Sequence, residues 1–327
     1  MTKFDIIKKL LFSKKICFIN NSLQYLCLNE FLNLNLNSKD LTYFVGYPKT
    51  EDLIQLKSTI KIFKAKKINL IFLKDIFHIK LIHLILKIKK FFLNKYDLVI
   101  LGDYKYYLFR EFRKLSKKAI YLDDGVSTLD YNYWSKYYKI KNHNSKFFTF
   151  FNLKIKIPII KNNFKLLKTF SKKKKIDNSI TILGEALYEK KLVTKYYFED
   201  LIKNIIKKNY KKKIFYYPHR KEKIIYKIKK NYKNLCIIKN NYNVETNIVN
   251  NSFISKDIYG ISTTALATLK IILGKNNLIN FYNINIDKKG LVKKTDKRSK
   301  KSMDKHLEFM DNFSNYLKKN RVKNVQF

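Results

Sequence analysis

The order of apolar and polar stretches in the first half of the chain predicts an α/β domain. Short apolar runs that suit buried strands occupy residues 15–19, 41–45, 69–73, 97–101 and 119–122. The amphipathic stretches between them, which are typical of helices, occupy residues 20–33, 50–65, 75–94 and 103–117. Strands that alternate with helices at this spacing predict a parallel sheet covered by helices on both faces.

The alternation stops after the fifth run and restarts in the second half. We interpret residues 127–155 as irregular capping structure and residues 156–178 as an interdomain linker. Strand-like runs return at residues 179–183, 214–217, 235–238, 253–258 and 278–281, again with helical stretches between them. We therefore expect two Rossmann-like domains, one over residues 1–155 and one over residues 179–327.

The composition supports a globular protein without settling its partners. Hydrophobic residues make up 46% of the chain and aromatic residues 15%, too much for a disordered protein. The net charge of +45 favours anionic partners, either nucleic acid or a membrane surface. However, the lysines are spread over the whole chain, as A/T-rich coding would produce, and no nucleic-acid-binding motif is present. We expect no nucleic-acid partner, and keep a basic nucleic-acid-binding protein as the alternative from another class.

The cysteines and the apolar runs indicate a cytoplasmic protein. Cys17, Cys27 and Cys236 have neither metal-ligand spacing nor the pattern of a disulfide framework, so they suit a reducing compartment. The chain shows no signal peptide and no uninterrupted run of the ~18 apolar residues that a membrane span needs.

The run from Ile214 to Glu222 is the first candidate site. Four β-favouring residues lead to Pro218, which cannot donate to a β-ladder, and His219 and Arg220 follow. Ligands of open α/β sheets bind outside the carboxyl ends of the strands. A histidine there can protonate a leaving group or hold a phosphate. The alternative is a plain polar turn.

Two adjacent carboxylates follow another predicted strand. Asp123 and Asp124 precede Gly125, where a carboxylate can act as a general base beside an anion-tolerant loop. An Asx turn or a helix cap fits the same residues equally well. After the first strand, a polar turn opens a helix that Asn21 or Ser22 can cap.

A hydroxyl run and a rare glycine suggest phosphate binding in the second half. Ser262, Thr263 and Thr264 open a predicted helix, and hydroxyls, backbone N–H groups and the helix dipole can together bind one anion. Simple capping would need only one hydroxyl. Gly184, one of seven glycines, ends strand 179–183 and indicates a sharp turn or a close approach of ligand. The glycine-rich dinucleotide fingerprint and the P-loop are absent from the sequence, so neither enzyme class fits.

Five motifs occur in the order seen in glycosyltransferase family 52, the bacterial lipooligosaccharide sialyltransferases of GT-B type. These motifs are Asn20–Gln24, Asp123–Gly125, Leu183–Glu189, Pro218–Arg220 and Tyr259–Ala265. The chain resembles the family from about Lys15 to Phe281. The resemblance implies two Rossmann-like domains facing a cleft, with the acceptor on the N-terminal side and the nucleotide sugar on the C-terminal domain.

The resemblance also implies roles for individual residues. Asp124 corresponds to the base for the acceptor hydroxyl, and His219 to the histidine that contacts the CMP phosphate and assists its departure. Glu245 corresponds to an acid that binds the ribose hydroxyls. The motif that holds the phosphate corresponds to Ser262, Thr263 and Thr264. The other implied substrate-binding positions are Asn21, Gln24, Asp123, Gly125, Gly184, Glu185, Pro218 and Arg220.

Two positions depart from the family pattern. Arg220 stands in place of the proline that follows the histidine. Leu187 stands where some members carry an acidic residue proposed as the base, with Glu185 and Glu189 on either side. The base therefore stays open between Asp124 and Glu189, and we favour Asp124. The sequence has no Asp-x-Asp metal motif, so we expect no metal and no cofactor besides the donor substrate.

The resemblance predicts a sialyltransferase that transfers sialic acid from CMP-sialic acid to a terminal galactose of lipooligosaccharide or a related surface glycan. Transfer of another sugar, such as glucose from a UDP donor, is the alternative within the family. The expected partners are thus a nucleotide-sugar donor and a glycan or glycolipid acceptor, and a homodimer stays open.

The C-terminal region supports two interpretations. Residues 288–305 form a basic loop with nine Lys or Arg against Asp296 and Asp304. Apolar residues then recur at helical spacing in a predicted helix over 303–318: Met303, Leu307, Met310, Phe313 and Leu317. This helix either packs on its own protein or forms a peripheral anchor on the anionic inner face of the cell membrane.

Overall fold

The structure, a computed structural model, describes most of the 327-residue chain. The described residues are 2–34, 40–63, 68–75, 77–138, 144–171, 174–239, 241–261, 263–274, 278–287, 290–292 and 297–327. They form two compact units, Met1–Leu166 (unit 1) and Leu167–Phe327 (unit 2). This division falls inside the segment 156–178 that we predicted as the linker.

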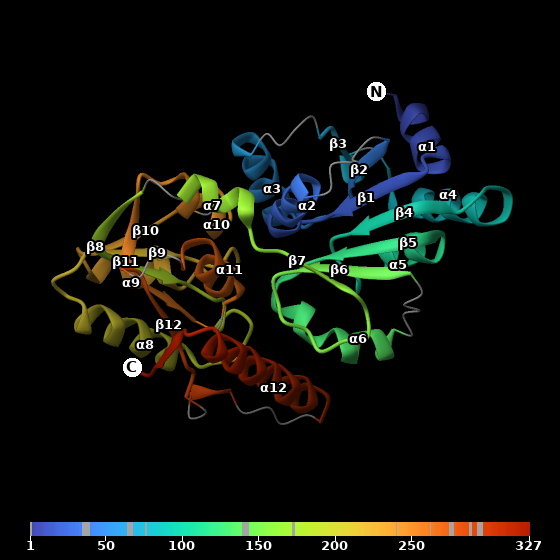
Figure 1. The fold of residues 1–327 in the computed structure, drawn as a ribbon. Coiled ribbons are helices and arrows are strands. Elements are labelled where there is room, and N and C mark those ends of the chain that lie inside the picture. Colours follow the sequence, from blue (N-terminus) through green and yellow to red (C-terminus); the bar gives the residue numbers. More distant parts are fainter. Residues whose placement is uncertain are drawn as a thin grey trace. The chain divides into compact units, whose positions relative to one another are not determined.

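Unit 1 is built on a seven-stranded parallel sheet (Figure 1). Its strands are β1 (Lys15–Ile19), β2 (Leu41–Val45), β3 (Leu70–Phe72), β4 (Tyr96–Leu101), β5 (Ser116–Leu122), β6 (Ser145–Thr149) and β7 (Ile159–Lys161). Its helices are α1 (Lys3–Phe12), α2 (Ser22–Leu34), α3 (Thr50–Ile62), α4 (Ile79–Phe92), α5 (Tyr107–Lys114) and α6 (Tyr131–Tyr137). The strand order β3-β2-β1-β4-β5-β6-β7 changes direction between β1 and β4, which makes a switch point where ligands of such sheets bind.

Both faces of this sheet are buried, which explains why continuous apolar runs predicted its strands. In β1, Ile16 and Phe18 belong to the core formed with α1, α4 and α5. Cys17 and Ile19 are buried on the opposite face. A strand covered on both sides selects apolar residues at every position rather than at alternate ones.

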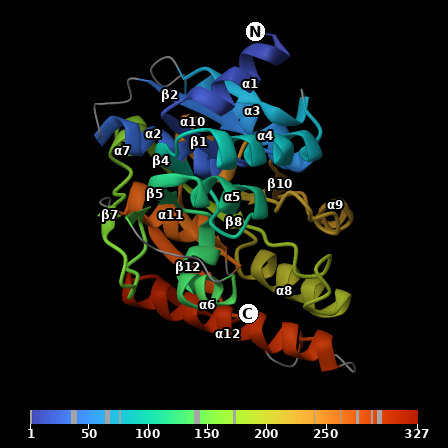
Figure 2. The same ribbon diagram turned by 90° about the vertical axis from the view of Figure 1, so that its right-hand side faces the viewer.

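Unit 2 repeats the architecture with a six-stranded parallel sheet (Figure 2). Its strands are β8 (Lys175–Leu183), β9 (Ile214–Tyr217), β10 (Leu235–Ile237), β11 (Phe253–Gly260), β12 (Asn280–Ile284) and β13 (Lys323–Val325). Its helices are α8 (Lys195–Lys208), α9 (Ile225–Ile228), α10 (Val244–Asn250), α11 (Thr264–Leu273) and α12 (Lys297–Lys319), and α7 (Lys165–Ser171) crosses from unit 1. The order β10-β9-β8-β11-β12-β13 places the switch point between β8 and β11.

The structure differs from the sequence prediction in several elements. Residues 127–155, expected to be irregular, contain α6 and β6, and the expected linker 156–178 contains β7, α7 and the start of β8. Because β7 pairs with β6, the chain up to Lys161 belongs to the sheet of unit 1. Neither α1 nor β13 was predicted.

The C-terminal helix also starts earlier than predicted. α12 begins at Lys297, so the second part of the basic run is helical, and residues 288–289 and 293–296 of that run lie outside the described residues. Phe313 and Leu317 of its predicted apolar face are buried. Of the described helices, none is long and apolar enough to cross a membrane.

Candidate functional site

The carboxylate of Asp124 lies at the carboxyl end of β5, against the first turn of α2. Gln24 Nε2 donates to Asp124 Oδ1 at 2.7 Å, and Asn21 Nδ2 donates to the same oxygen at 3.2 Å. Ser127 Oγ donates to Asp124 Oδ2 at 3.2 Å. The Asp124 side chain is 18% exposed, so it is oriented by three donors yet still reachable. Two polar turns that the sequence showed only separately thus meet at one place in unit 1.

Two residues that the sequence analysis did not identify, Asp103 and Lys105, shift the pKa of Asp124. Lys105 Nζ is 4.0 Å from Asp124 Oδ2, and Lys105 N donates to Asp103 Oδ1 at 2.7 Å. Burial, and then the negative charge of Asp103, raise the pKa of Asp124 to about 7 against the opposing charge of Lys105. Burial also raises the pKa of Asp103. A carboxylate with a pKa near 7 is matched to proton abstraction at neutral pH.

Gly102, at the end of β4, allows α2 to approach closely. A Cβ at this position would lie 2.2 Å from Gln24 Oε1. That oxygen accepts from Asn20 N at 2.7 Å, while the Nε2 of the same amide donates to Asp124. The glycine therefore leaves room for the buried amide that orients Asp124. The same glycine was the sequence signal that could have drawn attention to Asp103.

Asp123 has a different environment from its neighbour. It is fully buried, Thr149 Oγ1 donates to its Oδ1 at 2.5 Å, and Phe150 N donates to its Oδ2 at 2.8 Å. Burial raises the pKa of Asp123 to about 7 despite these hydrogen bonds. Its carboxylate thus ties β5 to β6 and is inaccessible to a substrate. Gly125 has φ of 73°, in the left-handed region that glycine adopts without strain.

In unit 2, His219 lies directly after β9, as predicted. Its backbone N donates to Glu222 Oε2 at 3.0 Å, and Glu222 N donates back to the carbonyl of His219 at 2.8 Å. Lys221 N donates to His219 Nδ1 at 3.2 Å, so the ring proton of the neutral imidazole is on Nε2. Burial lowers the pKa of His219 to about 4, although the negative charge of Glu185 opposes this. The ring is therefore a neutral hydrogen-bond donor near pH 7.

A charged pair lies beside this imidazole. Glu185 Oε1 is 3.9 Å from His219 Nε2 and accepts from Lys190 Nζ at 2.5 Å. Burial alone would raise the pKa of Glu185, but the positive charge of Lys190, together with hydrogen bonds from Lys190 and Ala186 N, holds the pKa below its usual value. Pro218 is buried and the Arg220 side chain is exposed. Groups from the ends of β8 and β9 thus come together here.

Gly184, at the end of β8, is packed against a buried acid that the sequence did not reveal. A Cβ on Gly184 would lie 2.3 Å from Glu222 Oε2 and 2.7 Å from Tyr216 OH. Tyr216 OH donates to Glu222 Oε1 at 2.6 Å, and burial raises the pKa of Glu222 to about 8. Glu222 therefore joins the turn after β8 to the His219 loop. In the sequence, Glu222 lies between two lysines, a pattern that is typical of a solvent-exposed helix.

Glu189, the second candidate base, holds the chain that leads into α9. Its Oε1 accepts from Lys223 N at 2.6 Å and from Ile224 N at 3.0 Å, and its Oε2 is buried without a hydrogen-bond partner. Two backbone donors on one oxygen are the geometry of a structural cap. The choice of base between Asp124 and Glu189 stays a prediction.

Glu245 links two helices of unit 2. It is 5% exposed, Thr268 Oγ1 donates to its Oε1 at 2.5 Å, and Asn243 Nδ2 donates to its Oε2 at 3.0 Å. Burial raises the pKa of Glu245. Because the carboxylate is buried, a ribose hydroxyl could reach it only after a rearrangement, so the role in ribose binding stays a prediction.

The predicted hydroxyl run begins at the switch point of the sheet in unit 2. Ile261 N donates to the carbonyl of Leu183 at 3.1 Å, which fixes the chain beside the end of β8. Thr263 is at the N-cap of α11 without a side-chain capping bond, and Thr264 is the first helical residue. Ser262 lies outside the described residues.

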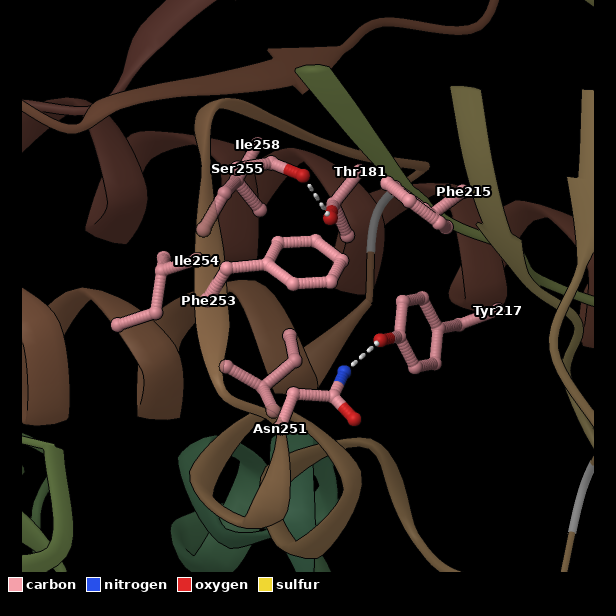
Figure 3. Close-up of a pocket in the computed structure, with 9 residues that line it drawn as sticks. Thr181, Phe215, Tyr217, Asn251, Phe253, Ile254, Ser255 and Ile258 are labelled. Atoms are coloured by element: carbon pink, nitrogen blue, oxygen red, sulfur yellow. Dashed lines mark hydrogen bonds between the residues drawn. The ribbon is translucent and has the colours of Figure 1, made fainter. Parts of the chain in front are cut away.

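A small cavity in unit 2 belongs to the core and is no substrate site. Figure 3 shows Thr181 and Ser255 joined on one side of it and Tyr217 and Asn251 on the other. Thr181 Oγ1 donates to Ser255 Oγ at 2.9 Å, and Asn251 Nδ2 donates to Tyr217 OH at 2.9 Å. The cavity measures about 10 Å³, which is barely room for one water.

Comparison with known proteins supports the architecture. No protein-family model matches the sequence, and no curated protein matches it by sequence. Among solved structures, the chain is similar to the UDP-GlcNAc 2-epimerase of Methanocaldococcus jannaschii in complex with UDP-GlcNAc and UDP. The TM-score is 0.53 and the identity 13%, over 82% of this chain and 83% of the epimerase. This is the GT-B fold class. The predicted fold class is therefore confirmed, as two parallel Rossmann-like sheets in one chain.

Two further solved structures are similar at lower scores. A 2,6-sialyltransferase of a Photobacterium species, solved with CMP and lactose, gives a TM-score of 0.49 at 10% identity over 95% of this chain and 78% of that one. MurG of Acinetobacter baumannii gives 0.46 at 8% identity over 95% and 85%. Identities this low speak for a fold and not for an activity. The resemblance to glycosyltransferase family 52 has no family match and stays a prediction.

Proposed function

We propose that this chain is a GT-B glycosyltransferase, related to family 52, that transfers sialic acid from CMP-sialic acid to a terminal galactose of lipooligosaccharide or a related surface glycan. The observation that carries the proposal is the environment of Asp124. It is a reachable carboxylate with a pKa of about 7, oriented by Gln24 and Asn21 at the carboxyl edge of a Rossmann-like sheet.

In the proposed reaction, the carboxylate of Asp124 acts as the general base. The acceptor hydroxyl oxygen forms a bond to the anomeric carbon of sialic acid, and Asp124 takes the hydroxyl proton. The bond between the anomeric carbon and the phosphate oxygen breaks, and its electron pair leaves with CMP. A base with a pKa near 7 is largely ionised above neutral pH and still basic enough to assist this step.

The proposal assigns donor binding to unit 2. The neutral His219 ring offers its Nε2 N–H to a phosphate oxygen, which needs no protonated imidazole. Thr263, Thr264 and the N-terminus of α11 would hold the same phosphate. In this scheme His219 stabilises the departing CMP by a hydrogen bond, so its low pKa does not impair it.

A donor panel tests the proposal. Binding and hydrolysis of CMP-sialic acid, CMP, UDP-glucose and UDP-GlcNAc would be measured with the full chain and with His219→Ala. We expect binding of CMP and CMP-sialic acid alone, weakened by His219→Ala. Binding restricted to UDP-sugars would replace the sialyltransferase with another nucleotide-sugar enzyme. Nucleic-acid binding that falls steeply with salt, without affinity for any nucleotide sugar, would overturn the enzyme proposal altogether.

A further inference from the structure

The helices α1 and α4 of unit 1 are neighbours (Figures 1 and 2). Both carry large apolar side chains that are exposed. Phe91 is 70% exposed and Phe92 is 79% exposed at the end of α4. We call the following set the α1–α4 surface: Phe4, Lys8, Phe12, Lys80, Leu84, Lys87, Ile88, Lys90, Phe91 and Phe92. All ten side chains are exposed. Exposed apolar side chains that gather on neighbouring helices are typical of an interaction site.

The spacing places these residues on outward faces. In α4, Lys80, Leu84, Ile88 and Phe91 follow one another at three- and four-residue intervals, and Lys87 lies three residues after Leu84 on the same face. Ile82, Ile85 and Leu86 pack into the core of unit 1. In α1, Phe4, Lys8 and Phe12 form a second outward line, and Ile6 and Leu10 are buried. The exposed aromatic side chains of α1 and α4 therefore take no part in the core of unit 1.

A buried lysine joins the two helices at one end. Lys89 Nζ donates to the carbonyl of Leu11 and lies 4.3 Å from the centre of the Tyr96 ring. The last turn of α1 thus lies against the last turn of α4. This contact brings Phe12 to the same end of the unit as Phe91 and Phe92.

The charge around these side chains is mostly positive, and Asp97, an acid beyond the end of α4 with a 43% exposed side chain, pairs with Lys117 at 2.8 Å. Residues 77–96 contain no acid, and the acid of α1, Asp5, accepts hydrogen bonds from Thr2 at the N-terminal end of the helix. The basic character continues into a cavity of about 960 Å³ beside α5. The cations that line this cavity are Lys95, Arg110, Arg113, Lys114, Lys117 and Lys118. Its acid, Glu111, accepts from Lys114 Nζ at 2.7 Å.

We propose that the α1–α4 surface docks unit 1 on a bilayer that contains anionic phospholipids. The phenylalanines insert among the acyl chains below the headgroups, and the lysines contact lipid phosphates. A second copy of the chain fits this surface poorly, because two such faces would bring like charges together. The predicted C-terminal anchor is less suited, since Phe313 and Leu317 of α12 are already buried in unit 2.

Vesicle sedimentation of the full chain tests this inference independently of any enzymatic activity. The probes are vesicles of phosphatidylcholine alone and vesicles with added phosphatidylglycerol. The double variant Phe91→Ser/Phe92→Ser removes apolar insertion, and Lys87→Gln/Lys90→Gln removes charge. The matched control is Tyr196→Ser/Leu278→Ser, because these two side chains of unit 2 are also well exposed, at 82% and 64%.

We expect the wild type and the control to sediment with anionic vesicles and to be released by high salt. The phenylalanine variant should bind at least about tenfold more weakly, and the lysine variant should lose the salt-sensitive part. Thermal unfolding would confirm that each variant is folded. Wild-type binding by the phenylalanine variant would overturn the proposal, as would equal loss in the control. Conversion of a dimer to a monomer by that variant, with vesicle binding unchanged, would identify a self-association surface instead.

Discussion

Two adjacent aspartates, Asp123 and Asp124, lie in different environments because different groups donate hydrogen bonds to them. Asp123 accepts hydrogen bonds from Thr149 Oγ1 and Phe150 N and is buried in the sheet. Asp124 accepts hydrogen bonds from side-chain amides, and 18% of its side chain stays exposed. Both carboxyls have a pKa raised to about 7 by burial. A raised pKa alone therefore does not identify the base, and accessibility decides between them.

The pH profile of turnover tests Asp124 and Asp103 together. We expect wild-type kcat/KM to fall below pH 7, because Asp124 must be ionised to accept a proton. Asp124→Asn should lower kcat by roughly 10²- to 10⁴-fold. Asp103→Asn removes the charge that raises the pKa of Asp124, so the acidic limb should move to lower pH. Asp97→Asn is the charge-matched control, because Asp97 pairs with Lys117 on the surface and should leave the profile unchanged.

A contrasting result would identify the other acid. If Asp124→Asn keeps near-normal turnover and Glu189→Gln is inactive, Glu189 is the base and its contacts with Lys223 N and Ile224 N must open during the reaction. If the acidic limb of the kcat/KM profile stays in place in Asp103→Asn, Asp103 does not influence the group whose ionisation limits turnover.

Sequence reasoning identified residues with a visible local pattern and missed those defined by long-range packing. Asp124 and His219 follow strand-like runs and lie next to a turn residue, so their place at a strand end was predictable. Asp103 also follows a strand-like run and Gly102, but the sequence does not show that its charge acts on Asp124. Glu222 carries no such pattern. Glu222 is an acid among lysines in the sequence, and only the fold turns it inward against Tyr216 and the turn after β8.

At the scale of elements, the turn after β8 depends on Gly184, because a glycine has no Cβ to collide with Glu222. In Gly184→Ala the new methyl would displace Glu222 and with it the acceptor of His219 N. We expect a loss of stability of about 1–3 kcal/mol, measured by denaturant unfolding. CMP affinity should fall about tenfold, because the loop that presents the imidazole is disturbed.

Gly46→Ala is the control that distinguishes an effect on the His219 loop from a general loss of stability. Its Cβ would lie 2.6 Å from Asn20 Oδ1 and 3.1 Å from the ring of Phe109, both in unit 1. This variant should lose stability without losing CMP affinity. Wild-type CMP affinity in a destabilised Gly184→Ala protein would show that the loop does not contribute to donor binding.

The elements that were predicted are those whose own sequence specifies them. The central strands β1, β2, β4 and β9 and the second half of β8 are largely apolar runs buried on both faces, so the pattern alone indicated them. By contrast, β7 and β13 have three residues each and little burial, and they are strands because a neighbouring strand pairs with them. Pairing partners far along the chain cannot be recognised from a single short segment.

At the scale of the whole molecule, the charge of +45 acts on every anionic partner. A positive field attracts nucleotide sugars, anionic lipids and nucleic acids alike, so charge alone does not identify the function. What separates these partners is local structure: a tuned carboxylate in unit 1, a neutral imidazole donor in unit 2 and exposed phenylalanines on α1 and α4.

Sialyl transfer by the full chain is the most direct measurement of the proposed function. CMP-sialic acid and an acceptor with a terminal galactose would be incubated with the protein, and sialylated product and released CMP would be quantified together by chromatography. We predict equal amounts of both products, and a rate lower by on the order of 10²-fold or more for His219→Ala. Intact CMP-sialic acid under conditions where the chain transfers sugar from a UDP donor would contradict the assignment, and so would CMP release that does not depend on His219.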